Sequence, residues 1–175
     1  MNHTLNNSMQ ASLAEDVRQG IHELVLSGYP AEEIEKWIRE AVKPSRLRIT
    51  KDYRILLTDY GAEVKLLQLP KALFFFFLKH ETGCGAKDLR DYRDELLAIY
   101  NKVTIFGNQE GNERRIDKLI DPINGSFIEK CSLIKHAFIS ALSATRARPY
   151  YIHGPKGQPK VISLDRSLVD WEVNL

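Results

Sequence analysis

The first part of the chain carries hydrophobic residues at helical spacing. From about residue 12 to 27 they recur every three or four positions, on one face: Leu13, Val17, Ile21, Leu24 and Val25. Gly28-Tyr29-Pro30 interrupts this helix. A second helix is expected from Pro30 to about Val42, with its own apolar stripe of Ile34, Trp37, Ile38 and Ala41. The two predict a helical hairpin with a joint apolar face.

Pro44 marks a change in the pattern. Because proline restricts the residue before it and cannot continue a helix, we place a boundary at Lys43-Pro44-Ser45. Residues 1–44 then form an N-terminal helical hairpin extension, and residues 45–175 form a second domain. Just beyond the boundary, β-prone stretches at 47–49, 54–58 and 63–67 predict a small antiparallel sheet.

The next element is expected to be a helix from Pro70 to about His80, and it is apolar all round. One side can take Leu73, Phe76 and Phe77, but Phe74 and Phe75 must then point elsewhere. A single core contact cannot bury all five. We therefore expect Phe74 and Phe75 to form an interface that the N-terminal hairpin or a second copy of the chain covers.

Two further helices follow in the pattern. Residues 87–103 predict one helix, and residues 126–142 predict another with apolar positions Phe127, Cys131, Ile134, Phe138 and Ala141. Ser126 is expected to cap the second, because Glu129 follows it at capping-box spacing. Between them, 105–124 is interpreted as a long loop with at most a short helix at 113–120; both an ordered and a mobile loop remain open.

The C-terminal part predicts a β-hairpin with a basic tip. Tyr150 to His153 and Lys160 to Leu164 are β-prone, and they flank a Gly- and Pro-rich turn. The expected fold class is thus α+β.

Charge is unevenly distributed, although the net charge is only +2. Residues 127–166 carry seven Lys and Arg against two Asp and Glu, whereas residues 1–44 carry four against seven. The low net charge does not by itself indicate a nucleic-acid partner, but positive charge is concentrated in the C-terminal helix and hairpin.

Several other classes of protein are disfavoured by the sequence. The polar start has no secretory pattern, and the longest dense apolar run, at 73–78, is far shorter than the ~20 residues of a membrane span. Cys84 and Cys131 show no disulfide or zinc spacing. No paired acid and base or nucleophile arrangement stands out. We expect a cytoplasmic protein that is not an enzyme, with no cofactor, no metal site and no membrane partner.

The layout from Leu47 to Leu164 resembles the winged-helix effector domains of bacterial response-regulator transcription factors. The similar stretches are Glu63 to Leu78, where a strand leads through Leu69-Pro70-Lys71 into an apolar helix, Phe127 to Leu142 as the third helix, and Tyr150 to Leu164 as the wing. The resemblance implies a winged helix with a small antiparallel sheet, a three-helix core and a C-terminal hairpin wing. No receiver domain accompanies it, and the third helix contains no arginine.

The resemblance also implies a site. The third helix of that family enters the major groove and the wing contacts the backbone or the minor groove, so the chain is expected to bind double-stranded DNA and to act as a small transcriptional regulator. The groove-facing residues would be Lys130, Ser132, Lys135, His136 and Ser140. The phosphate-facing residues would be Arg146, Arg148, Lys156 and Lys160.

Two alternatives remain open at this point. The helix lysines can be an ordinary solvated face, and Lys156 and Lys160 can be turn residues that favour solubility. The domain can also be a winged helix for protein interaction or homodimerisation without DNA binding, because a fold does not settle a function.

Overall fold

The computed structural model describes residues 15–104, 108–155 and 157–175, without the side chains of residues 39, 41 and 42. The chain divides into two compact units, Met1–Lys43 and Pro44–Leu175. This division lies one residue before the boundary expected from Pro44. The described part combines helices with a small sheet, so the α+β class is confirmed.

The first unit consists of two helices joined by a short turn. One helix covers residues 15–26 of the described chain, and α2 covers Ala31–Val42. Gly28 has a φ of 89°, a left-handed conformation that glycine adopts at little cost, and it ends the first helix. Pro30 precedes α2, and Tyr29 packs edge-on against Trp37 with ring centroids 5.2 Å apart.

The second unit is built on a sheet of four short strands. They are β1 (Leu47–Ile49), β2 (Ile55–Leu57), β3 (Ala62–Val64) and β4 (Val169–Trp171), in the spatial order β3-β2-β1-β4. The first three pair antiparallel, but β4 runs parallel to β1. The expectation of a purely antiparallel sheet was therefore wrong, because the C-terminal segment adds a fourth strand in the parallel sense. A 3-10 turn, η1 (Thr58–Tyr60), joins β2 to β3.

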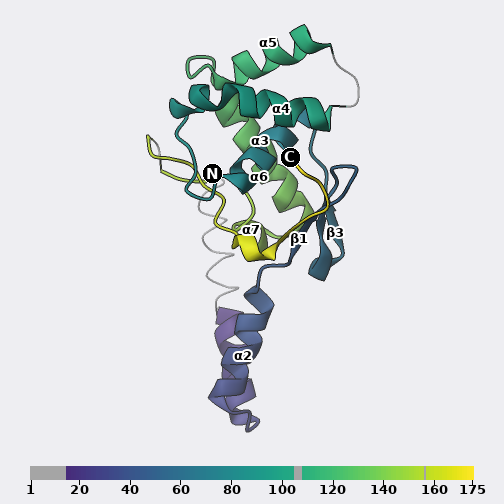
Figure 1. Cartoon of the computed structure of the whole chain (residues 1–175). Helices are drawn as coiled ribbons and strands as arrows, with labels where there is room; N and C mark the ends of the chain where they lie inside the picture. The colour runs from purple at the N-terminus through teal and green to yellow at the C-terminus, as the bar shows by residue number, and fades with distance from the viewer. Residues whose placement is uncertain (1–14, 105–107, 156) are drawn as a thin grey trace. The chain divides into compact units, whose positions relative to one another are not determined.

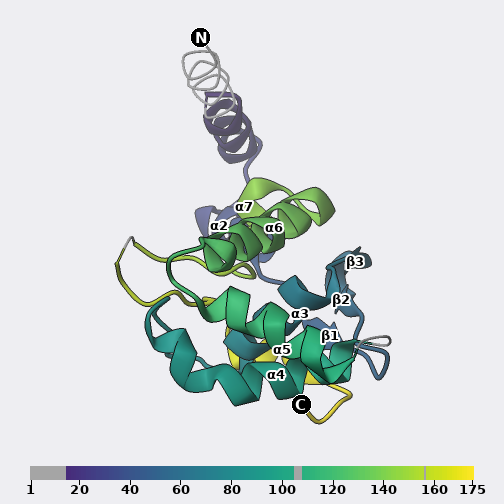
Figure 2. The same ribbon diagram turned by 90° about the horizontal axis from the view of Figure 1, so that it is seen from above.

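Helix α3 (Gln68–Lys79) lies at the centre of the second unit, with α4 and α6 packed against it (Figures 1 and 2). Phe74 and Phe75 have no exposed surface. The Phe74 ring packs against Phe138 at 5.1 Å, and the Phe75 ring against Trp171 at 5.6 Å. The prediction of an interface at Phe74 and Phe75 was therefore wrong: α6 and β4 of the same unit cover them.

Helix α4 packs on α3, and a further helix packs on α4 in turn. The single helix expected over 87–103 is divided into a 3-10 segment, η2 (Asp88–Tyr92), and α4 (Arg93–Val103). Helix α5 (Gln109–Ile120) packs on α4, as Figure 2 shows. It is longer than expected because Asn108 caps it: the Asn108 side-chain oxygen accepts from the Gly111 amide at 2.7 Å. Most of the expected loop is thus helical, and residues 105–107 lie outside the described ranges.

Helix α6 (Ser126–Ala141) follows the expected pattern closely. Its cap differs, because Gly125, with a φ of 69°, precedes the first turn and Ser126 is itself helical. Phe127, Ile134 and Phe138 are buried against the core. A short helix, α7 (Ala144–Ala147), follows, and the Ser143 hydroxyl accepts from the Arg146 amide at its start.

The expected C-terminal hairpin is reduced to isolated bridges. His153 pairs antiparallel with Val161, and Lys160 pairs antiparallel with Cys84. The described residues of 150–164 form no continuous ladder, so the prediction of a regular β-hairpin was wrong. Glycine and proline residues in this segment leave few backbone amides and little side-chain packing to extend the pairing.

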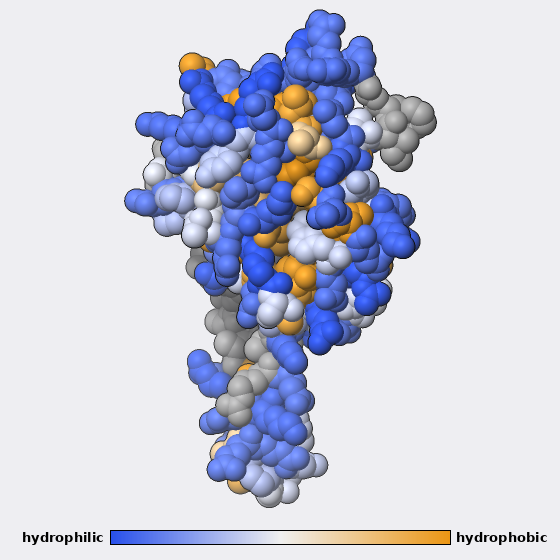
Figure 3. Space-filling model, viewed as in Figure 1, coloured by the Kyte–Doolittle hydropathy of each residue, from blue (hydrophilic) through white to orange (hydrophobic). Residues whose placement is uncertain are grey.

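A second contact fixes the end of this segment. Arg166 is the first residue of η3 (Arg166–Leu168). Its guanidinium donates to the carbonyls of Phe77 at 3.1 Å and Ile162 at 3.2 Å, and also to that of Leu164. On the face shown in Figure 3, the second unit carries a band of hydrophobic residues between hydrophilic ones. Partly buried residues of the C-terminal segment, including Val169 and Val173, pack against the core.

Candidate functional site

The exposed face of α6 holds four of the five residues expected to face the DNA groove. Ser132, Lys135, His136 and Ser140 are all exposed. At 100° per residue these four positions fall within one side of the helix, opposite the buried Phe127, Ile134 and Phe138. The structure thus brings these four predicted residues to one surface.

Lys130 does not belong to that surface. It is two residues from Ser132, and residues at that spacing do not face each other on a helix. Its side chain is only 18% exposed, and Nζ lies 2.8 Å from Oε1 of Glu129. The expectation that Lys130 is groove-facing was therefore wrong; its position on the helix turns it toward the protein.

The segment 148–160, which the structure describes except at residue 156, lies beside α6, and Lys160 holds its two described parts together. The Lys160 backbone pairs with Cys84 in both directions, at 2.9 and 3.0 Å. The Lys160 Nζ donates to the carbonyl of Pro155 at 2.6 Å and also to that of Gly154. Lys160 therefore closes its own loop. Because its partners are neutral carbonyls, the positive charge remains uncompensated by them.

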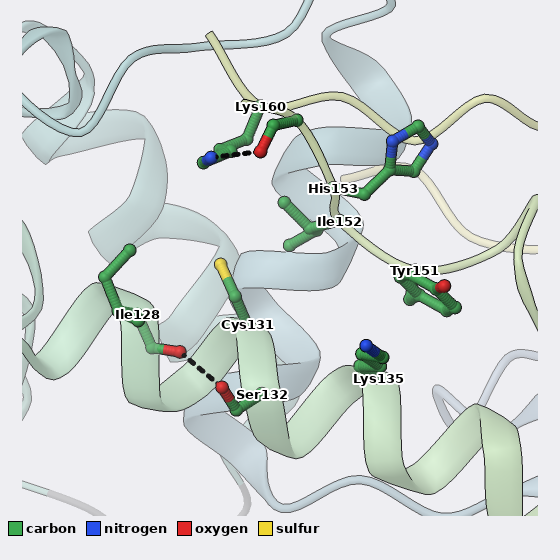
Figure 4. A pocket seen from close by; sticks show the side chains of 9 residues that line it. Ile128, Cys131, Ser132, Lys135, Tyr151, Ile152, His153 and Lys160 are labelled. Atoms are coloured by element: carbon green, nitrogen blue, oxygen red, sulfur yellow. Dashed lines mark hydrogen bonds between the residues drawn. The ribbon is translucent and has the colours of Figure 1, made fainter. Parts of the chain in front are cut away.

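Tyr151 connects this segment to α6. The Lys135 Nζ lies 5.5 Å from the centroid of the Tyr151 ring, a cation–π contact, and the lysine points from α6 toward this ring (Figure 4). Alternation along Tyr150 to His153 explains the placement. Tyr150 and Ile152 are buried, whereas Tyr151 and His153 are partly exposed.

A pocket of about 250 Å³ lies between α6 and this segment, lined by Ile128, Cys131, Ser132, Lys135, Tyr151, Ile152, His153, Gly154 and Lys160. The Cys131 sulfur points into it, toward the segment (Figure 4). The Ser132 hydroxyl donates to the Ile128 carbonyl at 3.0 Å. Two lysines and no carboxylate line the pocket, so it favours an anion over a cation.

A larger depression of about 780 Å³ adjoins it and shares Ile128, Gly154 and Lys160. Its other lining residues come from 85–88 and 157–159. The two hollows meet at these shared residues and form a groove that runs from α6 past Ile128 to residues 85–88. Lys87 and Lys160 line the second hollow together with one carboxylate, Asp88.

Burial changes the acid–base behaviour of two groups here. It raises the pKa of the Cys131 thiol to about 12, against a smaller opposing effect from Lys160, so this thiol stays protonated at neutral pH. Burial, then the charges of Arg148 and Lys160, lowers the pKa of His153. The His153 Nε2 is buried and has no hydrogen-bond partner in the described part of the chain.

The remaining predicted cations are dispersed. Arg148 is exposed, and its side chain makes no hydrogen bond or ion pair with another described residue. Arg146 lies over the Tyr60 ring, 5.3 Å from its centroid, on the side of η1. Lys156 lies outside the described residues.

Two exposed apolar residues on α6 were missed by the sequence reasoning. Ile128 is 54% exposed and Leu133 is 41% exposed. The signal was present, because neither belongs to the apolar stripe that runs through Phe127, Cys131, Ile134 and Phe138. Hydrophobic residues off the buried stripe of a helix point to solvent or to a partner.

Within the described ranges, no group of three or more His, Cys, Asp or Glu side chains could hold a metal ion. None of the helices in those ranges is long and apolar enough to cross a membrane. Comparison with known proteins adds no assignment: no family model, no curated protein and no solved structure matches this chain.

Proposed function

We propose that the second unit binds double-stranded DNA through α6 and the segment 148–160, as a winged-helix transcriptional regulator would. The observation that carries the proposal is the cationic groove beside an exposed helix face. Lys135 and Lys160 line it, as does His153, whose pKa the charge of Arg148 helps to lower. This pairing of a helix with an adjacent loop suits a helix in the major groove and a loop on the backbone.

The electrostatics support a polyanion as the partner. Glu129 is the one acidic residue of α6, and it is paired with Lys130. Cations on one surface bind phosphates and release condensed counterions, which makes affinity fall steeply with salt. Lys135 and Arg148 are the residues best able to contribute, because both are exposed and neither is paired with a carboxylate of the described chain.

Lys160 supports the proposal in a different way from the one first expected. Its ammonium group is occupied by the Gly154 and Pro155 carbonyls, so its contribution is to shape the loop and to add positive potential. Replacing it should disturb the loop as well as the charge. It is therefore a poor residue for a test of phosphate contact.

The test is a titration of random-sequence duplex DNA followed by fluorescence anisotropy at several salt concentrations. The Lys135→Glu/Arg148→Glu double variant should bind more weakly, with the salt slope reduced by about 2, close to one per lost phosphate contact. Lys51→Glu is the matched control, because Lys51 is an exposed lysine in the turn between β1 and β2. If the double variant had the same affinity and salt slope as Lys51→Glu, this surface would not be the DNA-binding surface.

A second candidate function is self-association through the first unit. Its helices leave apolar side chains exposed, including Val25, Leu26 and Ile38. Two short helices bury little apolar area by themselves and commonly gain stability from a partner. Sedimentation of the full chain distinguishes the cases: a dimer that Leu26→Ser/Ile38→Ser converts to monomer supports this function, and a monomeric wild type contradicts it.

A further inference from the structure

The DNA-facing side of α6 contains one feature that phosphate contacts leave unexplained. Ile128 is 54% exposed in the first turn and lines both hollows of the groove. Covering the exposed part of this aliphatic side chain with an apolar group of a partner would remove it from water and favour binding.

The position of Ile128 relates it to the polar residues of the same face. Ile128, Ser132 and Lys135 are spaced i, i+4 and i+7, so they form one stripe along the helix. Ile128 lies toward the N-terminal end of that stripe. In helices that enter the major groove, residues near the N-terminus reach the edges of the bases.

The chemistry of the major groove restricts what an isoleucine can recognise there. The C5 methyl group of thymine is the apolar group that base pairs present in that groove. Guanine is most often read by arginine, and α6 has none. The cations around Ile128 match the phosphates that flank a base step, which favours DNA over an apolar protein surface as the occupant.

We infer that α6 recognises thymine, with the Ile128 side chain in contact with thymine methyl groups. This inference rests on the proposed function and adds the sequence class of the ligand: sites in which A·T pairs face the N-terminal half of α6. Ser132 lies one turn further along the same stripe. Its hydroxyl can accept a hydrogen bond from a neighbouring base edge, or donate one if it gives up its present bond to the Ile128 carbonyl.

The experiment compares a short alternating A·T duplex with the same duplex containing deoxyuridine in place of thymidine, which removes only the methyl groups. Both are titrated against the wild-type chain and Ile128→Ala. Wild type should bind the thymidine duplex about three- to five-fold more tightly for each methyl group that the side chain covers. Ile128→Ala should lose this preference and bind both duplexes with the affinity that wild type has for the uridine form.

Leu133→Ala is the control, because Leu133 lies five residues, or about 140°, around the helix from Ile128. It should keep the full preference for thymidine. The fold of each variant is checked by thermal melting, and Ile128→Ala should melt like wild type because its side chain is half exposed.

Two outcomes overturn the inference while leaving the proposed function intact: wild type that binds both duplexes equally, or Ile128→Ala that keeps the wild-type preference. If Ile128→Ala kept the preference, Ile128 would not contact thymine and could instead contact a protein partner. Binding to neither duplex, nor to random-sequence DNA at low salt, refutes the proposed function itself.

Discussion

The hydroxyl of Tyr150 donates a hydrogen bond of 2.9 Å to the carbonyl of Ser45, 105 positions earlier in the chain. The Tyr150 ring stacks on Phe138 of α6, with centroids 5.5 Å apart and an interplanar angle of 6°. The buried Tyr150 side chain therefore connects the start of the second unit, the C-terminal half of α6 and the segment 148–160. Burial also raises the pKa of Tyr150 well above its usual value, so the hydroxyl remains a donor at ordinary pH.

Tyr150→Phe should lower the free energy of unfolding by about 1–2 kcal/mol, because the ring stays but the Ser45 carbonyl loses its buried donor. Urea unfolding followed by circular dichroism measures this loss. Tyr151→Phe is the matched control, since no hydrogen bond of the Tyr151 hydroxyl to another described residue is present. Equal stability of the two variants would show that the Tyr150 hydroxyl contributes nothing.

Gly83 allows the closest backbone approach beside the groove. It has a φ of 78°, and a Cβ added there would lie 2.1 Å from the Lys160 carbonyl oxygen. Gly157 has nearly the same φ, 77°, but open space around it. Gly157→Ala should cost only the left-handed strain, about 1 kcal/mol.

Gly83→Ala should cost clearly more than Gly157→Ala and should weaken DNA binding, because segment 160–161 must move away from Cys84. Paired denaturation curves and anisotropy titrations test both effects. Equal losses of stability in the two variants would contradict the close approach.

Arg166 should be a structural residue and not a DNA contact, although it belongs to the basic C-terminal region. Three carbonyls, including that of Phe77 in α3, accept from its guanidinium. Arg166→Met should cost about 2–3 kcal/mol, in the range of charge-assisted hydrogen bonds to a partly buried group. The salt slope of DNA binding, measured below the melting temperature, should stay unchanged. A reduced salt slope in Arg166→Met would indicate that Arg166 contacts DNA phosphate.

His153 should make the second unit less stable in mild acid. Its pKa is lowered by burial and by Arg148 and Lys160, so the folded state favours the neutral ring. The stabilisation is therefore complete above the unfolded pKa of about 6.5 and is lost as the pH falls below it. Unfolding free energies measured from pH 8 to pH 5 should show this decline in the wild type and a smaller one in His153→Gln.

Arg148→Gln provides the check on the cause. It removes one of the two cations that disfavour the protonated ring, so the His153 pKa measured by NMR should rise toward its ordinary value. An unchanged His153 pKa in that variant would exclude Arg148 as a cause.

Regular periodicity predicted much of this fold. The apolar stripes of α2 and α6, because local spacing decides which face is buried, predicted those helices to within two residues at each end. The dense apolar run after Pro70 predicted α3 equally closely. The sheet was predicted less completely. Strand β4 has only three residues, and its parallel pairing with β1 depends on the tertiary fold and not on its own pattern.

The errors at Phe74, Phe75 and Lys130 arose because residue type and spacing do not show which tertiary neighbours a side chain meets. Periodicity showed that Phe74 and Phe75 point away from the first core face, but it could not show that Trp171 and Phe138 meet them. Lys130 is polar, and polarity alone assigned it to the solvent face, whereas its angular position and its bond to Glu129 exclude it from the stripe of Ser132 and Lys135. Exposure of Ile128 was detectable only as a mismatch with the buried stripe.

The most direct test of the proposed DNA surface is residue-resolved amide NMR of the full chain during titration with random-sequence duplex DNA at low salt. If α6 and the segment 148–160 bind DNA, the largest chemical-shift changes fall in α6, from Ile128 to Ser140, and in that segment. Strand residues 55–64 should remain nearly unchanged. Changes concentrated in the strands or in the first unit, or no change at any residue, would contradict the account.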